Sequence, residues 1–513
     1  MIDPIYLSHW HVEMRFDSFR CSGRWLLIYG LSGFIVFLFL VYHSTRQGLL
    51  SIKVPQVSTA QVSTVPQASE EGHCDPDPPA NWDKLYAWED NMPQHGVDLL
   101  SPERNTGRYL YFNNQIQGLG WNNVLNEVYV FILSYFWVWK LRKWCYPFSL
   151  MDSYLSYMSN RTYVFQDYIW SIEHYPWKNS KNKERPRIPL NALISGPTAG
   201  GAWDPTDPFP LSISHRFFDK VCPERRIINT REVKPSISSV KNGRIIFETW
   251  QKLLLEAPER CIEIQPAEED SWSQVFDLWF WGYGWCNDLW DEYRDSPVSR
   301  LLKTSPVVES AVARNMYSLR PRGPKPPLGV SSDPFDRMLA VHLRRGDYKQ
   351  HCMGLAQWNA TFYSWSLLPF LPDKFHHPPG WEADQDETLK TYLARCYPTE
   401  EEVTNKIRAS KKNFIDAAKP GEMRYLDTVY ILTNDRTEWV ENLTKMLYDD
   451  GWNHVVSTKE LELDPQQKEV SMSVDMDFAR RAAVFIGNGV GQMSFLLGFR
   501  TYENIFVVVF FHQ

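Results

Sequence analysis

MLAVHLRRGDY, residues 338–348, joins a short apolar run to two arginines and a glycine. An apolar run of this length, bounded by turn signals, predicts a buried strand, and the glycine allows the chain to turn sharply after it. A planar guanidinium group binds two phosphate oxygens at once. Arg344 and Arg345 therefore indicate phosphate binding at a strand end, although two arginines there would equally fit an ion pair at a domain interface.

The chain after this stretch alternates between short apolar runs and helical patterns. The apolar runs are 338–341, 429–432, 454–456 and 484–486, and the helical patterns are 399–412, 437–450 and 467–481. This alternation predicts βαβ units and a parallel sheet, in which ligands bind beyond the carboxyl ends of the strands. Polar or glycine-rich residues follow two of these runs: Thr433, Asn434 and Asp435 after the second, and the segment 487–491 after the last. We expect them to line a ligand site.

The first half of the body carries its own α/β pattern. RYLYF at 108–112 predicts a strand followed by a loop and a helix, and the aromatic stretch 271–293 predicts one or two buried helices. The run PRGPKPP at 321–327 cannot continue a helix and marks a domain boundary. We therefore expect two α/β domains at 81–320 and 336–513, joined by a linker at 321–335.

The N-terminal segment has the pattern of a membrane anchor. Residues 25–42 read WLLIYGLSGFIVFLFLVY, 18 residues without a charge, which nearly span a bilayer core as a helix. Arg15, Arg20 and Arg24 precede this segment, so the positive-inside rule places the N-terminus in the cytosol. We expect a cytosolic tail at 1–24, a transmembrane signal anchor at 25–43, a stem at 44–80 and a lumenal body; a buried core helix is the alternative for the apolar segment.

The composition limits the possible partners. The net charge of -7 comes without a long basic block, which excludes a nucleic-acid-binding surface. The 22 Trp residues have faces that either stack on sugar rings or fill cores. The triplets Asp75-Pro-Asp77, Asp384-Gln-Asp386 and Asp475-Met-Asp477 have the spacing of a metal-binding motif, but the first lies in the stem and the last in a predicted helix. No metal or other cofactor is predicted.

Three segments carry a resemblance to a known family. HLRRGDY at 342–348, VDMD through FIGN at 474–488, and GWNN with the following acid at 120–127 together resemble the GDP-fucose protein O-fucosyltransferase superfamily, particularly its fungal branch. The resemblance implies a GT-B-like fold of two Rossmann-like domains with the donor in the cleft between them. It assigns the acceptor side to the N-terminal domain at 81–320 and nucleotide-sugar binding to the C-terminal domain at 336–513. It also implies inversion at the anomeric carbon without a metal ion.

The resemblance also assigns roles to individual residues. Arg344 is expected to contact the donor pyrophosphate and to stabilise the leaving group, because without a cation guanidinium groups must neutralise departing GDP. Glu127 is the candidate general base, with a helix first-turn acid as the alternative. Asp475 either holds the nucleotide or is an ordinary helix acid. The implied donor-binding residues are Gly120, Asn122, Asn123, His342, Arg345, Asp347, Asp475, Asn488, Gly489, Gly491 and Ser494.

Two further features agree with a lumenal location. Cys352 and Cys396 flank an insertion after the arginine motif, and in an oxidising compartment we expect them to form a disulfide. Asn160, Asn359 and Asn442 begin the triplets that accept N-linked glycans.

The sequence thus predicts a single-pass type II membrane glycosyltransferase of the Golgi or endoplasmic reticulum. Its predicted reaction is transfer of fucose from GDP-fucose to a hydroxyl of a protein or glycan. Val124 and Leu125 stand where the family has Gln-Arg, and Gly491 and Gln492 stand where it has a serine pair. Two alternatives therefore stay open: a catalytically inactive lumenal glycan-binding protein of the same fold, and a transferase using another nucleotide sugar.

Overall fold

The computed structural model describes residues 80–487 and the backbone of 507–510. Within this span it leaves out 97–106, 114–120, 122–149, 171–174, 178–185, 205, 207–210, 267–273, 320–325, 347, 358–364, 366–367, 371–374, 376–383 and 436, and the side chains of 278–279. All the described residues belong to the compact unit Pro76–Gln513. None of the helices in the described part of the chain is long and apolar enough to span a membrane. The predicted anchor at 25–43 lies outside the described residues.

The C-terminal sheet is parallel and is built around the stretch 338–348. Its order is β12-β11-β10-β13-β14, from β10 (Met338–Leu343), β11 (Thr428–Thr433), β12 (His454–Ser457), β13 (Val484–Gly487) and β14 (Val507–Phe510). The four predicted apolar runs are strands β10 to β13. The chain leaves β10 toward β11 and β12 and returns on the other side at β13, so a topological switch point lies between β10 and β13.

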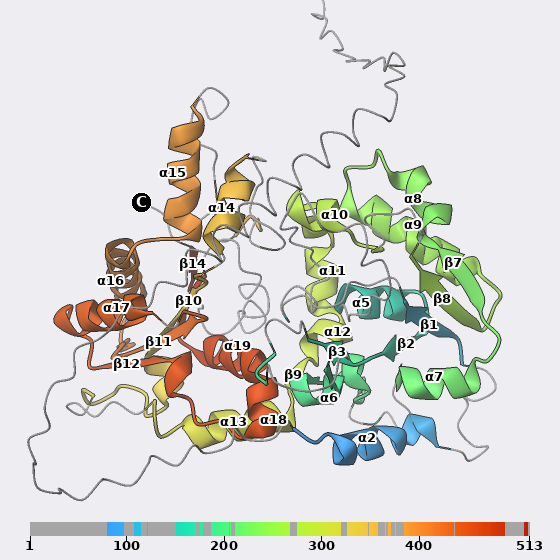
Figure 1. Ribbon diagram of the computed structural model, residues 1–513, viewed down its shortest axis with the longest axis horizontal. Helices are drawn as coiled ribbons and strands as arrows, with labels where there is room; N and C mark the ends of the chain where they lie inside the picture. Colours follow the sequence, from blue (N-terminus) through green and yellow to red (C-terminus); the bar gives the residue numbers. More distant parts are fainter. Residues whose placement is uncertain are drawn as a thin grey trace, which may run out of the picture. The chain divides into compact units, whose positions relative to one another are not determined.

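Alternate residues of β10 face opposite sides of this sheet. Leu339 and Val341 pack with α16 (Glu400–Asp416) and α17 (Glu438–Asp449), whereas Met338 and Ala340 share a core with α19 (Ser471–Arg481) (Figure 1). Burial on both faces explains why the strands are continuous apolar runs rather than alternating ones. The same alternation places His342 on the face covered by α19.

The N-terminal sheet is a second five-stranded parallel sheet. Its order is β6-β2-β1-β8-β7, from β1 (Tyr109–Phe112), β2 (Thr162–Phe165), β6 (Ser212–Ser214), β7 (Arg226–Asn229) and β8 (Cys261–Gln265). The predicted strand at 108–112 is β1. The last strand of this sheet in chain order, β8, pairs with β1, so the switch point of the sheet lies between β1 and β8. Two parallel sheets bear out the predicted α/β class, and the predicted domain limits stay predictions.

Helices and short strands connect and cover the two sheets. The aromatic stretch forms α10 (Leu278–Gly282), η4 (Trp285–Leu289) and α11 (Trp290–Asp295), with Phe280, Trp281, Trp290 and Tyr293 buried as predicted. The remaining elements are α2 (Asp83–Asp90), η1 (Pro93–His95), α5 (Leu150–Met158), β3 (Tyr168–Ile169), β4 (Arg187–Ile188), α6 (Leu190–Leu193), β5 (Ile194–Ser195), η3 (Pro197–Ala199), α7 (His215–Val221), α8 (Thr230–Ile237), α9 (Gly243–Glu256), α12 (Pro297–Arg300), β9 (Lys303–Thr304), α13 (Pro306–Asn315), η5 (Pro334–Arg337), α14 (Tyr348–Gln357), α15 (Gln385–Cys396), η7 (Thr458–Glu460) and α18 (Pro465–Glu469).

The segment 80–96 is tied to residues of both halves of the chain. Trp82 donates its indole N–H to the buried carboxylate of Glu469 at 2.8 Å. His95 is buried beside β6: its Nδ1 lies 2.6 Å from the Glu89 carbonyl, and its Nε2 accepts the Ser214 N–H at 3.1 Å. Burial lowers the pKa of His95 to about 4. The ring is therefore neutral, with the Nδ1 proton donated to Glu89.

Candidate functional site

The carboxyl ends of β10 and β11 meet in a turn held by one side-chain amide. Asn434 accepts the backbone N–H of Arg345 at 2.8 Å and donates to the backbone carbonyl of Arg345 at 3.2 Å. Gly346 follows with φ of 68°, a conformation that a side chain would strain. Asn434 therefore holds the arginine turn itself, in addition to its predicted place at the rim of a ligand site.

Arg345 is enclosed by its own chain. Its guanidinium carbon lies 3.8 Å from the ring centre of Tyr397 and 3.9 Å from that of Trp439. It donates to the Pro398 carbonyl at 2.7 Å, and its Nε is 3.8 Å from the Asp435 carboxylate. Arg345 is thus held by residues of the C-terminal part of the chain, and its ion pair with Asp435 lies beside β11 rather than at a domain interface. Its predicted contact with the donor stays a prediction.

Arg344 lies in a different environment although it is the next residue in the chain. It is half-buried, and its guanidinium carbon lies 5.6 Å from the ring centre of Tyr348 at the start of α14. The two arginines thus separate into an enclosed one and a half-buried one at the carboxyl edge of the sheet. The role of Arg344 as the pyrophosphate ligand stays a prediction.

His342 is held in the neutral state. Burial and the neighbouring positive charge of Arg344 lower the pKa of His342 to about 3. Its Nδ1 is buried and has no hydrogen-bond partner among the described residues. A neutral imidazole with one unoccupied nitrogen offers either a donor or an acceptor, depending on its tautomer.

Asp475 on α19 is hydrogen-bonded to a residue of β11 and to the first residue after β12. It accepts the Tyr430 hydroxyl at 2.5 Å, and the Thr458 hydroxyl lies 3.1 Å from both of its carboxylate oxygens. Thr458 in turn accepts the N–H of Thr433 at 3.3 Å, which links Asp475 to the strand end beside Asn434. Burial raises the pKa of Asp475 to about 7, although the two hydroxyl groups act in the opposite direction.

The second acid of the Asp475-Met-Asp477 triplet has separate partners. Asp477 is buried and accepts hydrogen bonds from Thr304, Arg480 and Arg481. The two acids therefore do not converge on one point. Within the described part of the chain, no group of three or more His, Cys, Asp and Glu side chains is arranged to hold a metal ion.

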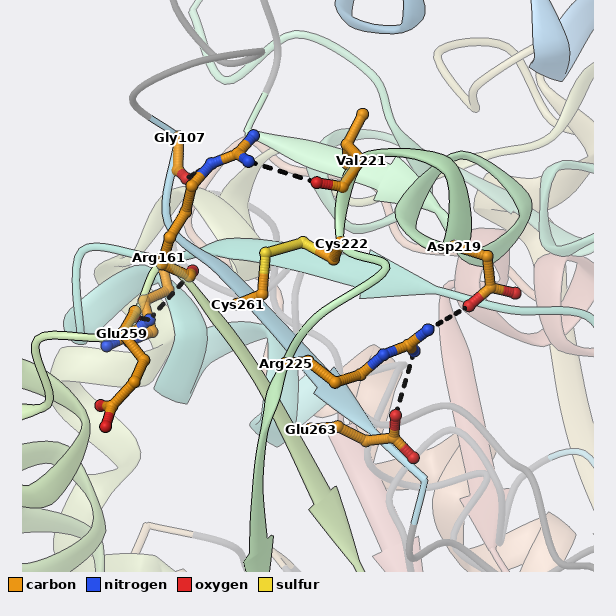
Figure 2. The surroundings of a disulfide bond; sticks show 10 residues. Gly107, Arg161, Asp219, Val221, Cys222, Arg225, Glu259, Cys261 and Glu263 are labelled. Atoms are coloured by element: carbon orange, nitrogen blue, oxygen red, sulfur yellow. Dashed lines mark hydrogen bonds and ion pairs between the residues drawn. A yellow bond between two sulfur atoms is a disulfide. The ribbon is translucent and has the colours of Figure 1, made fainter.

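The described part of the chain contains two disulfides. Cys352 and Cys396, the pair expected from the sequence, join α14 to the end of α15. The second disulfide joins Cys222, just after α7, to Cys261 at the start of β8 (Figure 2). Sequence reasoning missed this pair because nothing in the 39-residue separation marks the two cysteines as neighbours.

The structure describes two of the three predicted glycosylation sites. Of the two described sequons, Asn160 is exposed in the turn before β2 and Asn442 is exposed on α17. The structure adds two residues to the surroundings of Asp475 that the sequence did not single out, Tyr430 and Thr458. The hydroxyl of Tyr430, a polar group inside the apolar run of β11, was the signal in the sequence that could have identified the first. Outside the described residues lie Gly120, Asn122, Asn123, Glu127, Asp347, Asn359, Asn488, Gly489, Gly491 and Ser494.

Comparison with known proteins gives low similarity only. No family model and no curated protein matches the chain. A structure of POFUT1 in complex with GDP-fucose is 12% identical, with a TM-score of 0.43 over 80% of this chain and 99% of the other. NodZ alpha-1,6-fucosyltransferase soaked with GDP-fucose is 11% identical, with a TM-score of 0.34 over 76% and 92%. An Arabidopsis thaliana FUT1 mutant in complex with GDP is 10% identical, with a TM-score of 0.33 over 82% and 79%. At these values the similarities do not decide the function.

Proposed function

We propose that the chain is a glycosyltransferase that binds GDP-fucose at the carboxyl edge of the C-terminal sheet and transfers fucose to a hydroxyl of a protein or glycan. The observation that carries this proposal is the arrangement of Arg344, His342 and Asp475 around the ends of β10 and β11. One cation, one neutral imidazole and one carboxylate at such an edge match the phosphate and base of a nucleotide.

Arg344 supplies the charge that the reaction needs. A departing nucleoside diphosphate carries growing negative charge, and a preorganised guanidinium group stabilises it more as the bond to the sugar breaks. The packing around Arg345 and the two hydrogen bonds from Asn434 to the backbone of Arg345 fix the chain from which Arg344 projects. The general base on the acceptor side is the predicted role of Glu127.

Asp475 favours guanine over the other bases. Guanine presents two adjacent N–H donors, at N1 and N2, and a carboxylate with two acceptor oxygens accepts both. Uracil offers one N–H between two carbonyl oxygens, which a carboxylate repels. Each oxygen of Asp475 retains acceptor capacity beside its hydroxyl partners. Because only the ionised form accepts both bonds, we expect GDP affinity to rise with pH toward the pKa of Asp475, about 7.

The test is a thermal-shift comparison of GDP, UDP and CMP on the purified protein. A ligand at 100 times its Kd stabilises the folded state by about 2.7 kcal/mol, so GDP alone should raise the Tm. Asp475→Asn should remove the preference for GDP, whereas Asp416→Asn, at the exposed end of α16, should keep it. Equal Tm shifts with all three nucleotides would refute the preference for guanine. No Tm shift with any of them would refute a guanine nucleotide as the ligand.

The second candidate is a catalytically inactive lumenal glycan-binding protein of the same fold. Val124 and Leu125, and Gly491 and Gln492, favour it, because they replace polar residues of the family's motifs. GDP release from GDP-fucose in the presence of acceptor separates the two candidates. An enzyme releases GDP with turnover, whereas the inactive protein binds without release.

The proposed location is the membrane of the Golgi or endoplasmic reticulum, with the body in the lumen. Two disulfides support it, since structural disulfides are typical of oxidising compartments and rare in the cytosol. The uncharged segment 25–42 is the proposed anchor.

A further inference from the structure

A buried carboxylate at the end of β8 organises a second group of polar side chains. Glu263 is 5% exposed, and its Oε2 lies 3.0 Å from Nη1 of Arg225. Arg225 also pairs with Asp219 at 2.9 Å (Figure 2) and lies over the Phe218 ring at 4.8 Å. The other oxygen of Glu263 accepts two side-chain amides, from Asn113 and from Gln265, both at 2.7 Å.

The carboxylate determines how both amides point. An ionised carboxylate only accepts hydrogen bonds, so the NH₂ groups of Asn113 and Gln265 must face Glu263. Their carbonyl oxygens are then turned away from it. Both residues are half-buried, and neither carbonyl oxygen has a hydrogen-bond partner among the described residues. Asn113 and Gln265 thus each keep one acceptor oxygen at the carboxyl ends of the neighbouring strands β1 and β8.

The position of these amides is the switch point of the N-terminal sheet. Asn113 follows β1, and its backbone N–H donates to the Ile264 carbonyl of β8 at 2.8 Å; Gln265 ends β8. Ligands of open parallel sheets bind beyond the carboxyl ends of the strands at such a point. The base of the network is cross-linked, because Cys261 of the Cys222–Cys261 disulfide lies two residues before Glu263 on the same face of β8 (Figure 2).

The chemistry of this edge differs from that of the C-terminal sheet. The C-terminal edge carries a cation and a carboxylate, which suit phosphate and base. The N-terminal edge presents neutral carbonyl oxygens, which suit the hydroxyl groups of a neutral polyol. A nucleotide sugar contains both parts, a charged nucleotide and a neutral sugar ring.

We propose that Asn113 and Gln265 accept hydrogen bonds from hydroxyl groups of the donor's sugar ring, and that Glu263 is the positioning residue that fixes both amides. This inference rests on the proposed function, since it assigns the sugar half of the proposed nucleotide-sugar donor. It separates the recognition of GDP, at the C-terminal sheet, from the recognition of the sugar, at the N-terminal sheet.

The experiment measures the Kd of the full chain for GDP and for GDP-fucose by titration calorimetry. Asn113→Ala removes one acceptor, and loss of one neutral hydrogen bond should weaken GDP-fucose binding about 3- to 10-fold. Its Kd for GDP should not change. Asn453→Ala is the matched control, because Asn453 is also half-buried but lies at the amino end of β12, away from both edges; it should leave both Kd values unchanged.

Glu263→Gln tests the positioning role separately. The glutamine amide has one acceptor oxygen and one donor group, so it cannot hold both amides and Arg225 as the carboxylate does. We expect the ratio of the two Kd values to move as in Asn113→Ala, together with a lower Tm. A lower Tm with an unchanged ratio would mean that Glu263 is only structural and would overturn its assigned role.

The outcomes for the wild type distinguish this inference from the proposed function. If the wild-type protein fails to bind GDP, the proposed function is wrong and this inference fails with it. If it binds GDP, and Asn113→Ala and Gln265→Ala bind GDP-fucose as tightly as the wild type does, the sugar is not held at this edge. The inference alone is then refuted.

Discussion

The same conservative change at two adjacent residues should give opposite results. Arg344→Lys and Arg345→Lys both keep the charge and remove the planar guanidinium fork. Arg345 is stacked between Tyr397 and Trp439, whereas Arg344 is half-buried at the sheet edge. We therefore expect Arg345→Lys to lower stability and Arg344→Lys to lower catalysis.

The structure sets the size of each effect. A desolvated cation–π contact contributes about 2 kcal/mol, and a hydrogen bond from a charged group about 1.5–3 kcal/mol. A lysine at 345 keeps its charge but loses the stacking and the fixed geometry toward the Pro398 carbonyl, now 2.7 Å from Nη1. We expect a loss of about 2–3 kcal/mol, or roughly 4–12 °C in Tm for a domain of about 150–250 residues.

Arg344→Lys should leave the Tm nearly unchanged, because substitutions outside enclosed positions usually alter stability by less than about 0.5 kcal/mol. Its transfer rate should fall about 100-fold or more, as for removal of one preorganised charge-stabilising donor. The assay is GDP release with donor and acceptor, with the Tm measured for each variant. Near-normal turnover by Arg344→Lys, or an unchanged Tm for Arg345→Lys, would refute the separation of roles.

Three further predictions concern stability and location. Since burial lowers the pKa of His95 to about 4, its neutral form stabilises the protein above pH 6.5 and that contribution is lost as pH falls toward 4. Relative to His95→Gln, the free energy of unfolding of the wild type, measured in urea, should therefore fall by about 3 kcal/mol between pH 6.5 and 4. Parallel plots of this free energy against pH for the two proteins would contradict the prediction. Peptide mapping without reductant should recover Cys222 linked to Cys261, and replacing both by Ser should cost about 2–5 kcal/mol. In sealed microsomes, protease should spare residues 80–513 until detergent is added; digestion without detergent would reverse the proposed topology.

The strands of the C-terminal sheet were predictable because their signal is local. Strands buried on both faces must be apolar along their whole length, and the runs at 338–341, 429–432 and 484–486 show this directly. Alternation with helical patterns then predicts parallel pairing and hence the edge at which polar residues gather. The disulfide between Cys352 and Cys396 was also predictable, because the two cysteines flank one insertion.

The tertiary structure decided what depends on partners far apart in the chain. Arg344 and Arg345 are chemically identical neighbours, and the packing of Tyr397 and Trp439 against one of them separates an enclosed cation from a half-buried one. The sequence by itself determined that two arginines stand at the end of a buried strand. Which arginine is enclosed follows from side chains far along the chain, because the local pattern fixes only the direction of the backbone, whereas burial and charge at a side chain depend on everything that packs around it.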